Sequence, residues 1–239
     1  SGFKPIRVLR GLKRVGEGSR SSGGLRQVLV VVQFALSALL IVCTVIVYKQ
    51  MNYLQKKDLG FSKDQILYFD LQGDLAANPG PLKSELLRSP GVIGATAGYG
   101  LPGDQLAGDQ VIVPTDEGEK AQGVNLFIVD HDYIKTMGLT VLAGRDFSRN
   151  FPTDTSAAFI INETAVKELG FGTPEKALGQ PVSWPKWVPD PVNPVKKGRI
   201  IGVVRDFHFK SLHEKVNSAV LQIYPQVAVK MALKGRESD

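Results

Sequence analysis

An uncharged apolar run at residues 28–48 constrains this chain more than any other feature of its sequence. A helix needs roughly 20 apolar residues to cross the hydrocarbon core of a bilayer, and this run is about that long. The apolar core of a cleaved signal peptide is shorter and is followed by small residues in an A-x-A pattern, which is absent after Tyr48. The sequence therefore predicts a transmembrane helix.

The basic residues before this run predict its orientation. Residues 1–26 contain seven of them against Glu17 alone, so the leader carries as much net charge as the whole chain, +6: Lys4, Arg7, Arg10, Lys13, Arg14, Arg20 and Arg26. Basic flanks stay in the cytoplasm, which predicts a cytoplasmic N-terminus, a bacterial inner-membrane location and a periplasmic main domain. The remainder of the chain is close to neutral, which argues against nucleic-acid binding.

The helix is expected to continue beyond the membrane as a stalk. Residues 49–57 contain no glycine or proline, and Gly60 is a suitable stop, so residues 27–57 are assigned to the transmembrane and stalk helix. Gln33 and Ser37 lie four residues apart and share a helix face. Polar residues in lipid commonly face another helix, which predicts contact with transmembrane helices outside this chain. The alternative is that the hydroxyls bond back to carbonyls of their own helix.

The part after the stalk reads as an α+β domain. Short strands and short helices alternate in mixed order, without a repeat. Strands are expected at 65–71, 92–97, 110–114, 124–129, 158–161, 199–204, 219–224 and 227–233. Helices are expected at 81–88, at 131–137 after an Asp130 cap and at 163–169 after an Asn162 cap. Cys43 is the single cysteine, so no disulfide within the chain can form.

The sequence offers no catalytic, cofactor or metal site. Gly98, Gly100 and Gly103 match G-x-G-x-x-G, but no helix is expected to open there, as a dinucleotide site requires. Neither a P-loop nor a G-x-S-x-G elbow occurs. Asp206, His208 and His213 are the nearest approach to a metal cluster, yet the only other histidine, His131, is remote in sequence. We therefore expect a protein that is not an enzyme, with hydrogen-bonded structural roles for these groups.

A proline-rich segment around Trp184 and Trp187 is the least regular part of the domain. Four prolines at 185–194 argue against a helix or a central strand. One interpretation is a loop that the two tryptophans pin to their own domain. The sharper hypothesis is a protruding contact for a partner or substrate, with Trp184 and Trp187 as its contact residues.

Several segments in order resemble one family, the MacB/FtsX-like ABC transporter permeases. Residues 25–37 resemble the first transmembrane helix, and residues 57–61 the stalk exit. The core of the family's periplasmic domain is matched by residues 130–139, 143–148, 161–165, 201–208 and 211–214. Residues 1–11 resemble the cytoplasmic segment that joins the two halves of the eight-helix members.

The resemblance implies a domain organisation. It comprises a cytoplasmic basic linker at 1–26, the transmembrane and stalk helix at 27–57, a Porter-like part at 58–140, an inserted Sabre-like part at 141–217 and Porter-like return strands at 218–239.

The resemblance also implies a function. The chain would be a permease fragment that passes ATP-driven conformational change to the periplasm, for efflux or for lipoprotein or peptide export. Its partners would be the membrane, a cytoplasmic ABC ATPase subunit that binds the ATP, a second permease copy or paralogue in a dimer, and a periplasmic or outer-membrane protein. The alternative is a single-pass protein with a periplasmic ligand-sensing domain, although the leader is short for a signalling domain.

Overall fold

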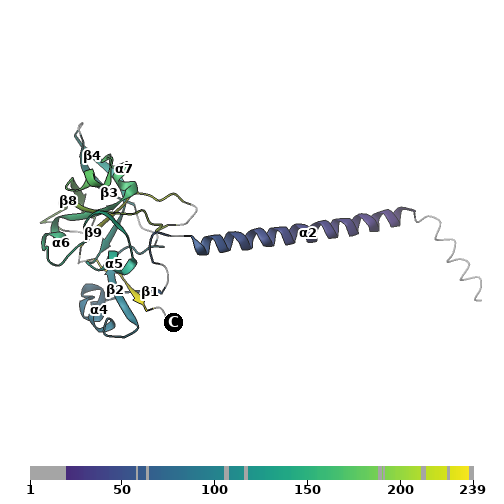
Figure 1. Cartoon of the computed structure of the whole chain (residues 1–239), viewed down its shortest axis with the longest axis horizontal. Coiled ribbons are helices and arrows are strands. Elements are labelled where there is room, and N and C mark those ends of the chain that lie inside the picture. The colour runs from purple at the N-terminus through teal and green to yellow at the C-terminus, as the bar shows by residue number, and fades with distance from the viewer. Residues whose placement is uncertain are drawn as a thin grey trace, which may run out of the picture. The chain divides into compact units, whose positions relative to one another are not determined.

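The computed structural model describes residues 20–57, 59–62, 65–104, 108–115, 118–187, 190, 192–210, 214–224 and 227–236. The chain forms two compact units, Ser1–Lys57 and Asp58–Asp239. The described part of the first unit is a single long helix, and the second unit combines helices and strands (Figure 1). This confirms the predicted α+β class.

Helix α2 (Arg20–Lys56) contains the predicted membrane span. Residues Arg26–Leu54, with a mean hydropathy of 2.8, are long and apolar enough to cross a membrane. At 1.5 Å per residue these 29 residues extend for about 43 Å. The hydrocarbon core of a bilayer measures roughly 30 Å. The helix is therefore longer than a membrane crossing requires, as the stalk prediction expected.

A three-stranded sheet contains both the first and the last strand of the second unit. Its order is β1 (Ile66–Asp70), β10 (Lys230–Gly235) and β2 (Val92–Gly98), and β10 is antiparallel to both neighbours. The sequence predicts a β-α-β unit across residues 65–97. The structure adds that β10, from the far end of the chain, lies between its two strands.

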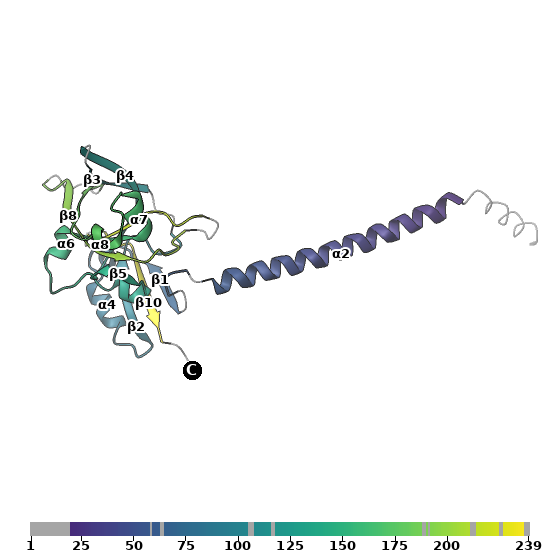
Figure 2. The same ribbon diagram turned by 45° about the horizontal axis from the view of Figure 1, so that its top comes forward.

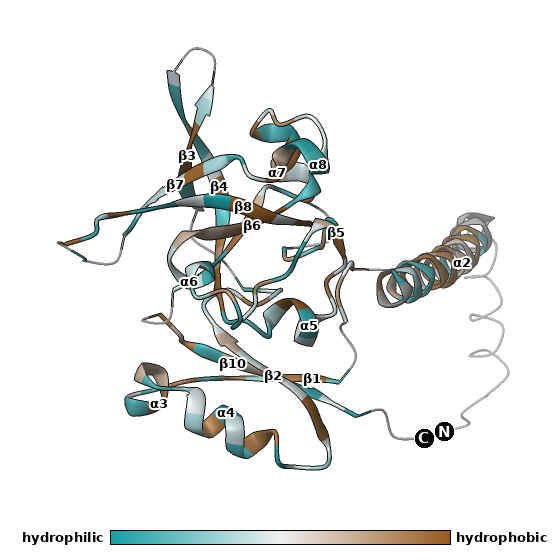
Figure 3. Cartoon of the chain, turned by 60° about the vertical axis from the view of Figure 1, so that its left-hand side comes forward, coloured by the Kyte–Doolittle hydropathy of each residue, from teal (hydrophilic) through white to brown (hydrophobic). Residues whose placement is uncertain are grey.

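Two helices cover one face of this sheet. Helices α3 (Asp74–Ala77) and α4 (Gly80–Leu86) lie on one side of the three strands, and α5 (Tyr133–Met137) lies on the other (Figure 3). The face toward α3 and α4 is apolar, with a small core built from Leu71, Ala95, Ala97, Ala228, Met231 and Leu233.

The second sheet has seven strands in the order β5-β8-β6-β9-β4-β3-β7, with a further pairing between β7 and β8. The strands are β3 (Gly108–Thr115), β4 (Gly118–Val129), β5 (Val141–Gly144), β6 (Ala158–Asn162), β7 (Pro181–Pro185), β8 (Val195–Val204) and β9 (Ala219–Ile223). The β3–β4 hairpin extends to the edge of the unit in Figure 2. Because β8 pairs with β6 through one part and with β7 through another, six strands close into a ring.

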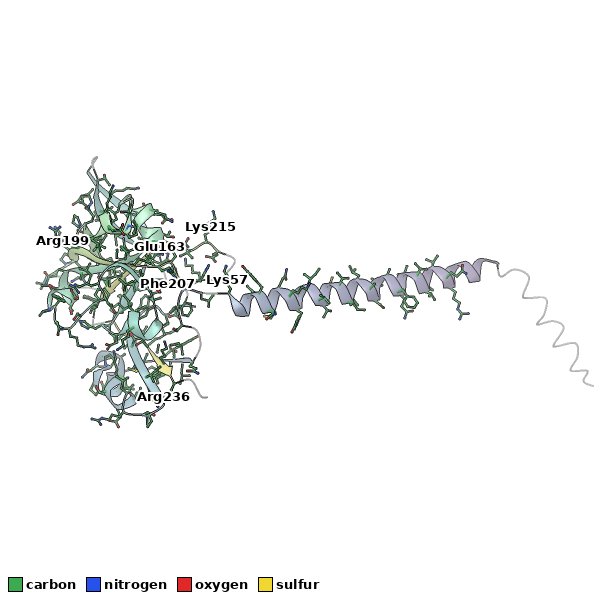
Figure 4. The ribbon with its side chains drawn as sticks, in the orientation of Figure 1. Lys57, Glu163, Arg199, Phe207, Lys215 and Arg236 are labelled. Atoms are coloured by element: carbon green, nitrogen blue, oxygen red, sulfur yellow. The ribbon has the colours of Figure 1, made fainter. Side chains whose placement is uncertain are left out.

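Two apolar clusters fill this larger part. One draws side chains from all six strands of the ring and from helices α7 (Glu163–Glu168) and α8 (Pro174–Ala177), so it fills the ring. The other packs α5 and the segment around Phe207 against the remaining sheet face. Phe207 is fully buried, and the N–H of the preceding residue, Asp206, donates to the Glu163 carboxylate at 3.0 Å; Phe207 and Glu163 are labelled in Figure 4. Helix α6 (Thr153–Ala157) leads into β6.

Each expected strand and helix is present with bounds shifted by a few residues, whereas α3, α6, α8, β5 and β7 were not expected. Helix α5 begins at Tyr133 after Asp132, so the prediction that Asp130 is its cap is wrong. The Asp130 carboxylate accepts from the Asp132 N–H just before the helix, at 3.1 Å, and from β2. Strand β7 runs through Trp184, where prolines argued against a central strand. Pro181 and Pro185 stand at its two ends, where a missing N–H costs least.

The Porter-like and Sabre-like division at 58–140, 141–217 and 218–239 stays a prediction. The two sheets divide the chain at other points. Strands β3 and β4 share the seven-stranded sheet with β5 to β9, whereas β1, β2 and β10 form the smaller sheet. The described start of α2 at Arg20 also lies inside the segment expected as a linker, of which residues 1–19 are outside the described residues.

Candidate functional site

Trp184 is part of the core. Its side chain has no exposed surface, packs edge-on against Tyr224 at 5.7 Å between ring centroids and donates from Nε1 to the Asp109 carboxylate at 2.8 Å. A buried indole needs such an acceptor, because an unpaired N–H would cost free energy. Trp184 thus pins β7 to β3, and it leaves no surface for the partner contact that the sequence suggested.

Trp187 lies on the surface, as a contact residue must. Its side chain is 52% exposed, and its ring lies 5.7 Å from that of Tyr99. With Asp109 and Leu126, the two rings line a hollow of about 250 Å³. A contact role for Trp187 stays a prediction, whereas Pro189 and Pro191 of the same segment lie outside the described residues.

The polar face of α2 satisfies its hydroxyls within the helix. The Ser37 hydroxyl donates to the Gln33 carbonyl at 2.9 Å, and the Thr44 hydroxyl donates to the Leu40 carbonyl at 2.8 Å. This is the back-bonding alternative. The bond from Ser37 involves only the backbone carbonyl of Gln33, and not the Gln33 side chain. A contact between this face and another transmembrane helix therefore stays a prediction.

The groups weighed as metal ligands have structural partners. The Asp206 carboxylate accepts from the backbone N–H of Thr164 at 2.9 Å and from its hydroxyl at 2.8 Å, at the start of α7. The Asn162 side chain caps the same helix by accepting from the Ala165 N–H, as predicted. Across the residues that the structure describes, no group of three or more His, Cys, Asp or Glu side chains could hold a metal ion. His213 lies outside those residues.

The G-x-G-x-x-G segment is a close crossing of backbones. Gly98 ends β2, and Tyr99 exchanges backbone hydrogen bonds with Ile128 at 2.7 and 3.0 Å. A Cβ on Gly98 would collide with the Ile128 carbonyl oxygen, which explains the glycine. No helix follows in the described residues 99–104. The segment therefore lacks the helix N-terminus that a pyrophosphate site needs.

An ion-pair cluster, which the sequence did not predict, joins the two sheets. Lys83 of α4 is buried and pairs with Asp130 and, at 2.5 Å, with Asp132. Asp130 also accepts from the Thr96 hydroxyl at 2.6 Å and the Ala97 N–H at 3.1 Å, both on β2. Arg149 binds Asp132 through two hydrogen bonds of 3.0 and 2.7 Å. We call Lys83, Asp130, Asp132 and Arg149 the junction cluster.

Within this cluster, the pairing of Asp132 with Arg149 favours the charged form of both side chains. Hydrogen bonds from Arg149, followed by those from Lys83, hold the pKa of Asp132 well below its usual range although burial opposes them. Burial lowers the pKa of neighbouring His131, and Arg149 adds to that effect. A hydrogen-bonded network of alternating charges between two packed layers helps to fix their geometry.

A second pair holds the chain after β5. The Arg145 guanidinium donates two hydrogen bonds, of 2.6 and 2.7 Å, to the buried Asp154 carboxylate, and the Ser148 N–H donates to the same carboxylate at 2.9 Å. Hydrogen bonds from Arg145 and Ser148 lower the pKa of Asp154 against the largest effect, burial, which raises it. Asp154 is 1% exposed, so its carboxylate serves these hydrogen bonds within the fold.

The segment that enters the second unit is fixed by backbone hydrogen bonds. The Ser62 N–H donates to the Met137 carbonyl at 2.8 Å, and the His208 N–H donates to the Leu59 carbonyl at 2.8 Å. Lys234 of β10 also donates to the Ser62 hydroxyl at 3.2 Å. We call residues 59–62 the entry segment. It ties the beginning of the unit to α5, to the chain beside Phe207 and to the last strand.

Comparisons with known proteins identify the fold. No family model and no curated protein matches the chain by sequence. Among solved structures, the periplasmic region of MacB from Actinobacillus actinomycetemcomitans aligns with a TM-score of 0.50 and 16% identity, over 75% of this chain and 78% of that one. The extracellular domain of the noncanonic ABC-type transporter YknZ from Gram-positive bacteria aligns with a TM-score of 0.46 and 18% identity, over 72% of this chain and 83% of that one.

The aligned share of this chain is too large for the long helix to account for it. At 16% identity the likeness establishes a fold and no more. It agrees with the mixed sheets and the split β-α-β unit described above. The chain carries a domain with the fold of the MacB periplasmic region, which confirms the resemblance seen in its sequence.

Proposed function

We propose that this chain is part of an ABC-type transporter permease that passes ATP-driven movement through its long helix to the domain outside the membrane. The observation that carries the proposal is the pairing of β1 with β10. Ile66 lies opposite Lys234, so the first strand begins and the last strand finishes at the same end of one sheet. A domain held at one end of a sheet can be moved as a body by helices that precede and follow it.

The entry segment supports such coupling. Its hydrogen bonds to Met137 and His208 join the residues after α2 to the larger core, and its bond from Lys234 joins them to β10. The length of the span, Arg26–Leu54, also exceeds a membrane crossing. Movement that enters the outer domain at the entry segment would therefore reach the contacts of both sheets.

The same proposal assigns the partners. ATP would be bound by a separate cytoplasmic ATPase subunit, and the permease would act as a dimer with a second copy or a paralogue. The transported material would be a drug, peptide or lipoprotein. This chain itself would catalyse no reaction and bind no cofactor, in keeping with carboxylates such as Asp154 and Asp206 that serve hydrogen bonds within the fold.

A spin-label experiment on the complete transporter tests the lever. Cys43→Ala first removes the thiol of this chain, and exposed Glu175 is then replaced by a spin-labelled cysteine. The distance between the labels of two protomers is measured with and without trapped ATP. We expect a nucleotide-dependent distance change. Three glycines inserted after Gln55 should abolish that change and leave ATP hydrolysis intact, because glycine interrupts a stiff helix.

The matched control inserts the same glycines after Gly118, an exposed residue at the start of β4 with no atom within 4 Å of its Cβ position. That variant should behave as the unmodified protein does. A distance change that survives the insertion after Gln55 would refute the lever.

A further inference from the structure

A basic hollow opens at the end of the strand ring where β7 and β9 finish and β8 begins. Its volume is about 460 Å³, within the range of roughly 300–1,000 Å³ that is usual for ligand sites. Polar side chains that could bind a ligand line it: Ser156 of α6, Lys186 and Asn193 of the loop after β7, Lys196 and Lys197 of β8, and Tyr224 after β9.

Two ammonium groups are buried at this hollow. Lys196 is 5% exposed, and the Lys186 side chain is 8% exposed. Lys186 pairs with Asp190 at 2.6 Å, while no described carboxylate lies within ion-pairing distance of Lys196. The Lys196 ammonium donates to the Ile223 carbonyl at 2.9 Å and lies 5.1 Å from the centre of the Phe159 ring. An ammonium has three donors, so one carbonyl leaves capacity for an anion.

The hollow carries a local excess of positive charge. Three lysines and one aspartate line it, and all three lysines come from two short stretches of chain. Burial, with the charge of Lys186 in addition, lowers the pKa of Lys196 to about 7. A buried charge without a counter-ion is costly, and an anion bound beside it would remove that cost.

The buried side-chain amide of Gln222 lies on the face of β9 that points into the strand ring. Among the described residues, Gln222 alone has side-chain nitrogen and oxygen atoms that are buried without a partner. It stands between Val220 and Tyr224, which both pack into the cluster that fills the ring, so strand alternation places Gln222 on that face too. Tyr224 lines the hollow, and two residues along a strand span about 7 Å.

We propose that this hollow binds the phosphate group of a phosphomonoester, between the Lys186 and Lys196 ammonium groups with the Ser156 hydroxyl and the Asn193 amide at the rim. A phosphomonoester carries nearly two negative charges and three acceptor oxygens near neutral pH, which suits two lysines and several neutral donors. A carboxylate would leave positive charge unbalanced. The site is independent of the transport role proposed above.

Calorimetric titration of the full chain in a neutral detergent tests the site. Glycerol 1-phosphate and short-chain phosphatidic acid serve as phosphate probes, and acetate serves as the carboxylate. We expect both phosphates to bind and acetate to fail. Tighter binding of phosphatidic acid would identify a lipid headgroup as the source of the phosphate, and equal binding a soluble ester.

Three variants complete the test. Lys196→Met removes the unpaired ammonium and should weaken phosphate binding by at least about tenfold. Ser156→Glu places a carboxylate at the exposed rim, where folding is least affected, and should abolish binding with an unchanged circular dichroism spectrum. Lys167→Met, exposed on α7 away from the hollow, should bind as the native chain does. Absence of phosphate binding, equal binding of acetate, or native affinity in both Lys196→Met and Ser156→Glu would overturn the proposal.

Discussion

At the scale of single residues, Lys83 is the most buried charged side chain of the junction cluster. Its side chain is 11% exposed and faces Asp130 and Asp132, which are 24% and 33% exposed. Lys83→Met should lower the free energy of unfolding by about 2 kcal/mol, since two partly buried carboxylates lose their shared cation. Urea unfolding of the purified chain in detergent measures this loss.

The control for Lys83 is Arg88, which pairs with Glu85 on the surface at 76% and 69% side-chain exposure. Arg88→Met should change stability by less than about 1 kcal/mol, as is usual for exposed pairs. Adding Asp130→Asn to each variant completes a double-mutant cycle. A coupling of Lys83 with Asp130 no larger than that of Arg88 with Asp130 would contradict the assigned role.

A half-buried carboxyl near the same cluster gives a pH prediction. Burial, with the charges of Asp132 and Asp154, raises the pKa of Asp146 to about 6, although the Phe147 N–H opposes the shift. A raised carboxyl pKa means that the folded state holds its proton more tightly, so this group lowers stability as pH rises from about 4 to 6. Asp146→Asn should therefore gain stability relative to the native chain across that window.

The measurement is the difference in free energy of unfolding between Asp146→Asn and the native chain at pH 4, 5, 6 and 7. Taking the difference removes the opposite contribution of Asp132, whose lowered pKa adds stability that is lost as pH falls. Glu119→Gln, on an exposed part of β4, is the control. A flat difference for Asp146→Asn between pH 4 and 7 would show that its carboxyl does not carry the effect.

Local chemistry explains which residues could be understood from the sequence. The Asn162 cap was predictable, because its partner is three residues away. Asp130 was misread as a cap because only its bond from the Asp132 N–H is local, whereas its partners Lys83 and Thr96 are 47 and 34 residues distant. The junction cluster and the lysine hollow could not be predicted, because each forms only when separate strands and loops meet.

At the scale of elements, β7 and the loop after it separate the two tryptophans. Trp184→Ala should cost about 3–5 kcal/mol of stability, because it empties a core position and leaves the Asp109 carboxylate without its indole donor. Trp187→Ala should cost less than about 1 kcal/mol, because that side chain is 52% exposed. Thermal unfolding of both variants checks the contrast.

The same pair tests the surface hypothesis for Trp187. If the Trp187 ring contacts a partner, Trp187→Ala should impair transport by the complete protein while folding stays normal. Trp187→Phe, which keeps an aromatic ring beside Tyr99, should restore most of the activity. Unimpaired transport in a well-folded Trp187→Ala variant would remove the contact role.

Strand pairing explains which elements the sequence could specify. Short apolar runs identified β6, β9 and the second half of β4, whose residues are all buried in the structure. Strand β7 was missed because Pro181 and Pro185 frame it, and its pairing with Lys196 and Lys197 of β8 is a property of the closed ring. The insertion of β10 between β1 and β2 is likewise long-range, since Tyr68 and Ala232 become neighbours only in the folded unit.

At the scale of the whole molecule, the proposed lever depends on the entry segment, and Gly60 is its tightest position. Gly60 has a φ of +77°, and a Cβ there would collide with the Asp206 carbonyl and the Phe207 backbone. Gly60→Ala in the complete transporter should therefore loosen the segment and reduce the ATP-dependent distance change at residue 175, while ATP hydrolysis continues. Gly170→Ala is the matched control, because Gly170 has a similar positive φ, +82°, but no atom within 4 Å of its Cβ position. Both variants carry about 1–2 kcal/mol of backbone strain, so only the collision separates them. Equal distance changes in the two variants would mean that movement reaches the domain by another route.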